Sequence, residues 1–406
     1  MKACRVIYAS FFVLCCIYVI FIRLQAIPIS ISYALYGLSI VSASAALLSS
    51  GVAKGGNKQD LTVIILFFLY YFVSGLLYVA FEESAPSWIL KDYIYSLLPL
   101  YFYIIVRLSK IELNVQILLL LAIIAITLID ILSIMMYFNV GFNLTSYFRQ
   151  DSLDYEGTIS FALSGVLGVI FTGFTNVIGI IICVFSPVRL HKITKIILCI
   201  LYVTCIFLTG QRTPIGGLVI IMLIFLLQKK GKGLAIIAVI AGLLAISIPY
   251  VNIEVEGISV EDVLVERTFS RFQNIKAGDT GRNDQYKVYN DGVAEYLLGQ
   301  GVGTHSPDNP QCTTPMPDAM LYRIFNEMGL LGLSLFLLFF YLNLMRAIRR
   351  RNWFIIALLA YMFLSNATNR VLFYAPFSIL PYFLLAYFNW HITKNDETKK
   401  IVGNVA

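Results

Sequence analysis

The sequence LNVQILLLLAIIAITLIDILSIMMY, residues 113–137, carries a single charged side chain, that of Asp130. An α-helix needs about 20 consecutive apolar residues to cross the hydrocarbon core of a bilayer, so this stretch predicts a transmembrane helix. Comparable stretches recur along the chain, at residues 6–22, 29–49, 61–81, 88–106, 159–185, 196–209, 214–228, 234–250, 328–345, 353–369 and 372–390. Together they predict about 12 transmembrane helices.

The composition of the 406-residue chain excludes a water-soluble globular protein. Hydrophobic residues make up 59% of the chain and charged residues 13%, and the mean hydropathy is +0.81. Soluble domains are roughly 45–50% apolar and about a quarter charged. We therefore expect an all-α polytopic integral membrane protein, whose surrounding partner is the lipid bilayer.

Neither a metal site nor a cofactor is expected from the sequence. Six of the seven cysteines lie in or beside apolar stretches, where cysteine acts as a small hydrophobic residue, and only Cys312 lies in polar sequence. The chain has three histidines and no CxxC or HExxH motif. The net charge of +7 is interpreted as a signal of membrane topology and not of nucleic-acid binding, because short cytoplasmic loops of membrane proteins are rich in lysine and arginine.

The distribution of basic residues predicts the orientation. If the N-terminus is cytoplasmic, 19 of the 30 lysines and arginines fall in the cytoplasmic tails or in short cytoplasmic connections. The short connections on the other face carry few, such as Arg23, Arg149, Arg212 and Arg370. This alternation predicts that both termini are cytoplasmic.

One connection is much longer than the others. Residues 251–327, between the ninth and tenth predicted helices, are polar and carry twelve Asp and Glu against six Lys and Arg. A segment of this length is usually a functional folded loop. We expect a partly helical periplasmic loop domain here, with helices over 261–272, 283–299 and 317–329, between transmembrane helices 1–9 (residues 1–250) and transmembrane helices 10–12 with the cytoplasmic tail (residues 328–406).

Arg212 is the first candidate for a functional residue. It lies in FLTGQRTPIGG (residues 207–217), at the outer junction of two predicted membrane helices. One interpretation is an interfacial arginine whose chain extends toward the headgroups. The other is an anion site, because Pro214 is expected in the first turn of the next helix, whose free backbone N–H groups would lie beside Arg212.

Further candidates lie in the long loop. Gly299, Gly301 and Gly303 predict either an ordinary turn, which we favour, or a backbone nest for an anion. A packed helix face is predicted from the helical spacing of Tyr286, Tyr289, Ala294 and Leu297. His305 is either a general base or a polar loop residue.

The start of the tenth membrane helix offers two more candidates. Asp318 is either the N-cap of that helix or a carboxylate base at the outer interface. Arg323 and Glu327 have the i,i+4 spacing of an ion pair. Lys91, Asp92 and Asp130 are the remaining charges at membrane depth, which are costly there and often functional. The alternative, which we favour, is that Lys91 and Asp92 pair with other charged groups and that Asp130 lies near the outer end of its helix.

Three stretches in this order resemble a known superfamily: TGQRT (209–213), TGRNDQYKVYNDGVAEYLLGQGVGT (280–304) and PDAMLYRIFNEMGLLGL (317–333). The chain resembles the O-antigen polymerase (Wzy) and O-antigen ligase superfamily of bacterial membrane glycosyltransferases. This resemblance implies ten to fourteen helices, a large periplasmic loop late in the chain, and no metal or nucleotide. It also implies a sugar donor linked to polyprenyl (undecaprenyl) pyrophosphate on the outer leaflet of the inner membrane.

The resemblance also assigns residues. Arg212 and Arg282 match the arginines that hold the donor pyrophosphate, and Arg323 or Arg370 would assist them. Glu327 and Gly329 match the Glu-x-Gly pair at the start of a membrane helix, which we interpret as structural. Ligases usually carry His-Asn nine residues before this glutamate. Here Asp318 and Ala319 stand at those positions, which favours the polymerase.

The sequence thus leads to an expected function. We expect a polymerase that joins lipid-linked oligosaccharide repeat units at the periplasmic face, with Asp318 or His305 as the general base and with a flippase and a chain-length regulator as possible partners. The alternatives are an O-antigen ligase and a flippase for the same lipid-linked saccharide. The absence of recognisable repeats between the two halves speaks against a transporter.

Overall fold

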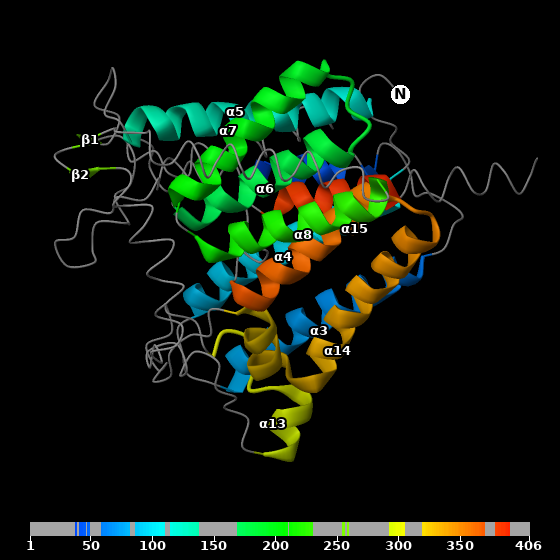
Figure 1. The fold of residues 1–406 in the computed structure, drawn as a ribbon. Coiled ribbons are helices and arrows are strands. Elements are labelled where there is room, and N and C mark those ends of the chain that lie inside the picture. Colours follow the sequence, from blue (N-terminus) through cyan, green and yellow to red (C-terminus); the bar gives the residue numbers. More distant parts are fainter. Residues whose placement is uncertain are drawn as a thin grey trace, which may run out of the picture. The chain divides into compact units, whose positions relative to one another are not determined.

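The computed structural model describes residues 37–38, 40–45, 47–48, 58–81, 86–109, 114–137, 169–209, 211–229, 254–255, 258–259, 292–304, 319–369 and 378–389. These residues are mostly helical (Figure 1). Four of the helices contain stretches long and apolar enough to cross a membrane, at Gln59–Leu77, Val115–Met135, Lys192–Thr209 and Met320–Arg349. The predicted class, a helical protein with membrane-spanning segments, is confirmed at this level.

The helices follow the predicted apolar stretches closely. They are α3 (Gln59–Phe81), α4 (Pro86–Leu108), α5 (Val115–Tyr137), α6 (Val169–Phe185), α7 (Lys192–Thr209), α8 (Arg212–Lys229), α13 (Val293–Leu298), α14 (Met320–Arg349), α15 (Trp353–Thr368) and a last apolar helix, Ile379–Asn389. The predicted helices 6–22 and 234–250 lie outside the described residues, and 29–49 is described only in short pieces. The total of about 12 therefore stays a prediction.

Contacts divide the chain into two compact units. Unit 1 comprises Met1–Cys15, Gly37–Leu113 and Thr280–Ala406, and unit 2 comprises Cys16–Tyr36 and Asn114–Asp279. The predicted division at residues 250 and 327 stays a prediction.

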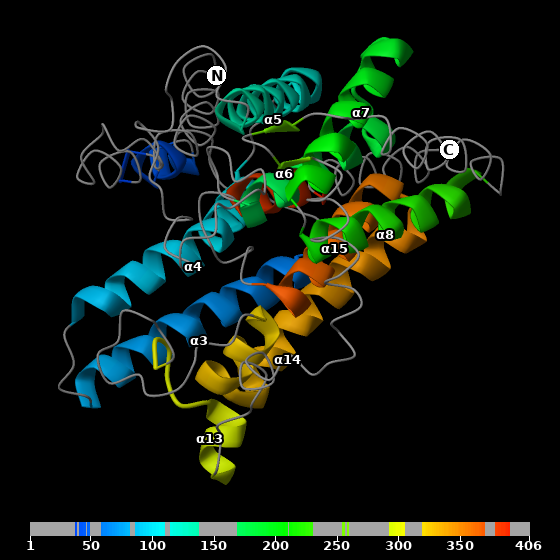
Figure 2. The same cartoon turned by 60° about the vertical axis from the view of Figure 1, so that its left-hand side comes forward.

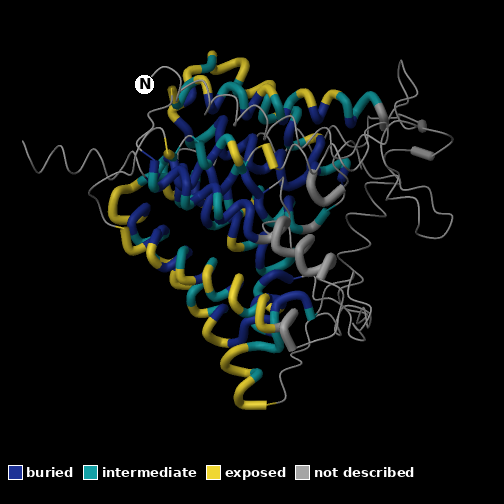
Figure 3. Tube along the Cα trace, turned by 180° about the vertical axis from the view of Figure 1, so that it is seen from behind, coloured by how far each residue is buried: buried dark blue, intermediate teal, exposed yellow. Residues whose placement is uncertain are grey.

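Unit 1 is built around α3 and α14, which run side by side in opposite directions (Figures 1 and 2). Aromatic side chains fill the space between its helices. Phe67 of α3 packs on Phe336 of α14 with ring centroids 5.5 Å apart, and Tyr103 of α4 meets Phe339 edge-on at 5.0 Å. Such pairs add to the stabilisation from buried area. Figure 3 shows buried and exposed stretches alternating along α3 and α14.

Unit 2 packs α6 against α5, α7 and α8 through small residues. A Cβ on Gly179 would lie 2.7 Å from the Tyr202 ring of α7, and one on Gly173 would lie 2.5 Å from Pro214 of α8. Both distances are too short for a real side chain, so glycine is required for the helices to approach this closely. Small residues serve the same purpose at helix interfaces throughout membrane proteins.

Unit 2 also contains a short antiparallel hairpin, β1 (Glu254–Val255) and β2 (Ile258–Ser259). Glu254 pairs with Ser259 and Val255 with Ile258. The sequence analysis had predicted only helices in this loop, because a two-residue strand is too short to show a pattern of alternating residues. The predicted helix over 261–272 lies outside the described residues.

Candidate functional site

The most distinctive backbone feature of unit 1 is a kink in α14 at Gly329. Its φ of 62° and ψ of −165° lie outside the helical region and divide α14 into a first part, Met320–Met328, and a long apolar second part. A Cβ at Gly329 would collide with the carbonyl group of Leu297. Only glycine satisfies both the backbone conformation and the close approach. The predicted helix running into the tenth membrane segment is confirmed, and this geometry supports the structural interpretation of Gly329.

The glycine-rich turn after α13 lies directly against this kink. The N–H of Gly299 donates to the Glu295 carbonyl over 2.7 Å. The N–H groups of Gln300 and Gly301 donate to the carbonyls of Asn326 and Glu327, over 2.9 and 3.0 Å. These donors point at protein carbonyls, so residues 299–301 form the ordinary turn that the sequence analysis favoured.

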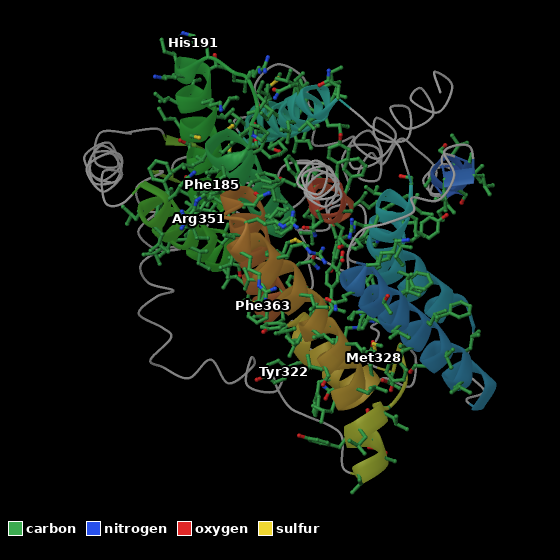
Figure 4. The ribbon with its side chains drawn as sticks, turned by 90° about the vertical axis from the view of Figure 1, so that its right-hand side faces the viewer. Phe185, His191, Tyr322, Met328, Arg351 and Phe363 are labelled. Carbon is green, nitrogen blue, oxygen red and sulfur yellow. The ribbon has the colours of Figure 1, made fainter. Side chains whose placement is uncertain are left out.

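Tyr70 of α3 joins these two segments. Its hydroxyl lies 2.8 Å from the Leu298 carbonyl oxygen, at the end of α13, and 3.2 Å from the Met328 carbonyl oxygen, at the kink. Figure 4 shows Met328 where α14 lies near α13. We call the assembly of α13, the turn 299–304, the first part of α14 and Tyr70 the Gly329 junction.

The side chains of α13 itself are not packed as predicted. None of its six residues is buried, and Leu297 is 46% exposed. The contact with α14 is made largely by backbone groups at the end of α13 and by Tyr296, whose ring meets Phe325 edge-on at 5.1 Å. The expected packing of Ala294 and Leu297 is therefore wrong, because the helix is held by its C-terminal end and not along one face.

Arg323 and Glu327 form the predicted i,i+4 ion pair inside the junction. Arg323 Nε lies 3.1 Å from Glu327 Oε1, and their side chains are 5% and 1% exposed. Two charges removed from solvent in this way are maintained only by each other and by further polar contacts. The ion pair is confirmed, and a role for Arg323 in holding pyrophosphate stays a prediction.

The start of α14 differs from one predicted alternative. Ala319, not Asp318, is the N-cap residue, and its side chain makes no capping hydrogen bond. The interpretation of Asp318 as N-cap is therefore wrong, because the helix begins one residue later than that interpretation requires. Asp318 and His305, the candidate bases, lie outside the described residues.

The backbone at Arg212 agrees with the sequence prediction. Arg212 is the first residue of α8, and Pro214 lies in the first turn, buried against α6. Proline suits this position because the first N–H groups of a helix have no partner within it. The Arg212 side chain, and all of Arg282 and Arg370, lie outside the described part of the chain.

A second polar cluster, which the sequence analysis missed, lies at the opposite end of α3. The Asp60 carboxylate is fully buried and accepts four hydrogen bonds. Arg107 of α4 donates from Nε and Nη2, each over 3.1 Å, and Arg346 of α14 donates from Nη2 over 2.8 Å. The Tyr103 hydroxyl donates the fourth, over 2.5 Å. We call these four residues the Asp60 cluster.

Two asparagines extend the Asp60 cluster to the last helix. Asn343 Oδ1 of α14 accepts a hydrogen bond from Asn389 Nδ2 and lies 3.4 Å from the Tyr103 hydroxyl oxygen. The cluster therefore joins the start of α3 to the ends of α4, α14 and the helix Ile379–Asn389. All four of these helix ends were predicted on the cytoplasmic face of the membrane, and that orientation stays a prediction.

The Asp60 cluster carries a net positive charge, since one carboxylate faces two guanidinium groups. Arg346 Nη1 is buried and has no hydrogen-bond partner among the residues that the structure describes. The sequence analysis counted Arg107 and Arg346 as topology signals. The available clue was that Asp60, Arg107 and Arg346 lie within one or two residues of the predicted apolar stretches, where a charge needs a partner.

No model of a known protein family matches the chain, and no curated protein sequence matches it. Within the described ranges, no three His, Cys, Asp or Glu side chains gather into a group that could hold a metal ion.

Proposed function

We propose that the chain is a bacterial inner-membrane polymerase for O-antigen or another surface polysaccharide. It would join oligosaccharide repeat units carried on polyprenyl pyrophosphate, at the periplasmic face. The observation that carries the proposal is the ordered set of sequence stretches at 209–213, 280–304 and 317–333. The geometry of the Gly329 junction supports it, because residues from the second and third stretches pack into one assembly.

The proposed reaction is a single displacement at a sugar carbon. The terminal hydroxyl of one lipid-linked unit attacks the anomeric carbon of a chain on a second lipid. The bond from this carbon to the pyrophosphate oxygen breaks, which inverts the anomeric centre and releases polyprenyl pyrophosphate. Asp318, or alternatively His305, accepts the hydroxyl proton as general base.

Arginines suit the leaving group. Pyrophosphate gains negative charge as the bond breaks, and guanidinium groups are always charged and bind phosphate oxygens in pairs. Arg212 and Arg282 would carry this role, with Arg323 or Arg370 assisting. The position of Arg212 at the first residue of α8 supports this, because free backbone N–H groups at a helix start also favour an anion.

The experiment is complementation of a deletion strain, followed by gel electrophoresis of its surface polysaccharide. Wild type should restore a ladder of chain lengths. Arg212→Ala and Arg282→Ala should leave a single-repeat band while the protein remains in the membrane. Arg189→Ala is the matched control, because Arg189 is exposed and lies on the predicted cytoplasmic side. This variant should restore the full ladder.

Other results identify the alternatives. Long chains that accumulate on the lipid carrier, without reaching the surface, indicate a ligase. Repeat units trapped on the inner leaflet indicate a flippase. Normal ladders from both Arg212→Ala and Arg282→Ala would refute the proposed pyrophosphate site.

A further inference from the structure

The Asp130 carboxyl in unit 2 is fully buried, and one of its two oxygens has no hydrogen-bond partner within the described part of the chain. Asp130 lies in the membrane-spanning part of α5. Its Oδ1 accepts a hydrogen bond from Asn176 Nδ2 of α6 over 2.9 Å. Among the described residues, neither Asp130 Oδ2 nor Asn176 Oδ1 has a hydrogen-bond partner. An unsatisfied polar atom in such a place is costly and calls for an explanation.

Asn176 has no donor left for this oxygen. Its Nδ2 carries two hydrogens, one directed at Asp130 and the other at the Thr172 carbonyl oxygen, 2.9 Å away. Turning the amide over would bring its oxygen against these same two acceptors. The orientation of the amide is therefore determined by its partners, and an ionised Asp130 would leave the pair with two unsatisfied acceptors.

No described basic side chain offsets a charge on Asp130. Among the described residues, no lysine or arginine forms an ion pair with it. The helices that pack on α5 are α6 and α7. From α6 the group facing Asp130 is the neutral Asn176. From α7 the Cys205 thiol hydrogen-bonds to the Asp130 carboxyl, and Tyr202 is the other titratable group near it. The Tyr202 hydroxyl lies 2.9 Å from Thr127 Oγ1.

We propose that Asp130 and Asn176 form a proton-binding site within the membrane-spanning part of unit 2. A proton on Asp130 Oδ2 removes the buried charge. It also turns Oδ2 from an unsatisfied acceptor into a donor, and the same hydrogen-bonded pair contains an unsatisfied acceptor, Oδ1 of Asn176. A metal ion suits the site less well, because ions such as Ca²⁺ take about 6–8 oxygen ligands, and a proton needs no cavity.

Infrared difference spectroscopy of the purified full-length protein tests the proposal. The spectrum of the Asp130→Asn variant is subtracted from that of wild type at neutral pH, where an exposed aspartate, with a pKa of about 3.9, is ionised. The expected difference is the carbonyl stretching band of a protonated carboxylic acid, which shifts in D₂O. Ser133→Ala is the matched control, because Ser133 is a buried polar residue of the same helix. This variant should keep the acid band.

The melting temperatures of the variants give a second readout. Asparagine has the shape and neutrality of a protonated aspartate, so Asp130→Asn should have the same melting temperature as wild type. Asp130→Ala should have a lower melting temperature. The bands of an ionised carboxylate at neutral pH, in place of the acid band, would overturn the proposal. None of these measurements depends on the proposed polymerase activity, so the two proposals can fail separately.

Discussion

The Asp60 cluster contains two positive charges and one negative charge. This imbalance predicts an order of stability among three variants, Asp60→Asn, Arg107→Met and Arg346→Met. Asp60 faces two arginines, so Asp60→Asn leaves two buried guanidinium groups without a counter-charge. Removing one partner of a buried ion pair costs about 3–5 kcal/mol. We expect the free energy of unfolding to fall by about 5 kcal/mol, at the upper end of that range, because both arginines lose their partner at once.

The two arginines should differ from each other. Arg107 donates two hydrogen bonds to Asp60, and Arg107→Met leaves Asp60 with Arg346 and Tyr103. Two charge-assisted hydrogen bonds of about 1.5–3 kcal/mol each are lost, but the cost of burying the guanidinium group is removed as well. We therefore expect the free energy of unfolding to fall by about 3 kcal/mol. Arg346→Met loses one such bond and also removes the buried, unsatisfied Nη1. These effects nearly cancel, so we expect a loss of about 1 kcal/mol or less.

The assay is an SDS unfolding titration in mixed micelles, followed by helical circular dichroism. Arg349→Met is the matched control, because Arg349 is an exposed arginine near the same end of α14. Surface changes of this kind usually stay within about 0.5 kcal/mol. Equal losses of unfolding free energy in Arg346→Met and Asp60→Asn would refute the charge argument, and so would an Asp60→Asn variant as stable as wild type.

Two further predictions concern the Gly329 junction. Gly329→Ala should lower the melting temperature in detergent, because alanine adds a Cβ against the Leu297 carbonyl at a positive φ. Gly37→Ala is the control, because a Cβ at that position meets nothing within 4 Å. Equal melting temperatures for the two variants would contradict the argument. Arg323→Met should lower the free energy of unfolding by about 3–5 kcal/mol, because it leaves Glu327 buried and charged. Adding Glu327→Leu should recover part of this loss. A double variant no more stable than Arg323→Met would show that the ion pair is not the cause.

The proportion predicted from the sequence differs between the fold and the candidate site. The helix positions followed from apolar runs alone, as α5 and α7 show, because a membrane-spanning helix satisfies its own backbone and needs only length and hydrophobicity. The start of α8 at Arg212 followed from Pro214. The Arg323 and Glu327 pair followed from spacing on one helix.

Contacts between distant helices could not be derived in this way. Tyr70 lies 228 residues from Leu298, and Asp60 lies 286 residues from Arg346. Nothing in the local pattern distinguishes Tyr70 from the other tyrosines of the chain. The exposed side chains of α13 were also missed, because regular spacing predicts a helix face and cannot say whether anything covers it.

The sequence by itself determined that this protein is helical and built for a membrane, since hydrophobicity and helix periodicity are local properties of the chain. Its spacing also determined which residues could pair within one helix. Only the tertiary structure decided that Asp60 binds two arginines, that Gly329 must be glycine, and that Asp130 meets Asn176. The physical reason is that buried charges and unsatisfied acceptors are defined by what surrounds them, and those surroundings come from helices far apart in the chain.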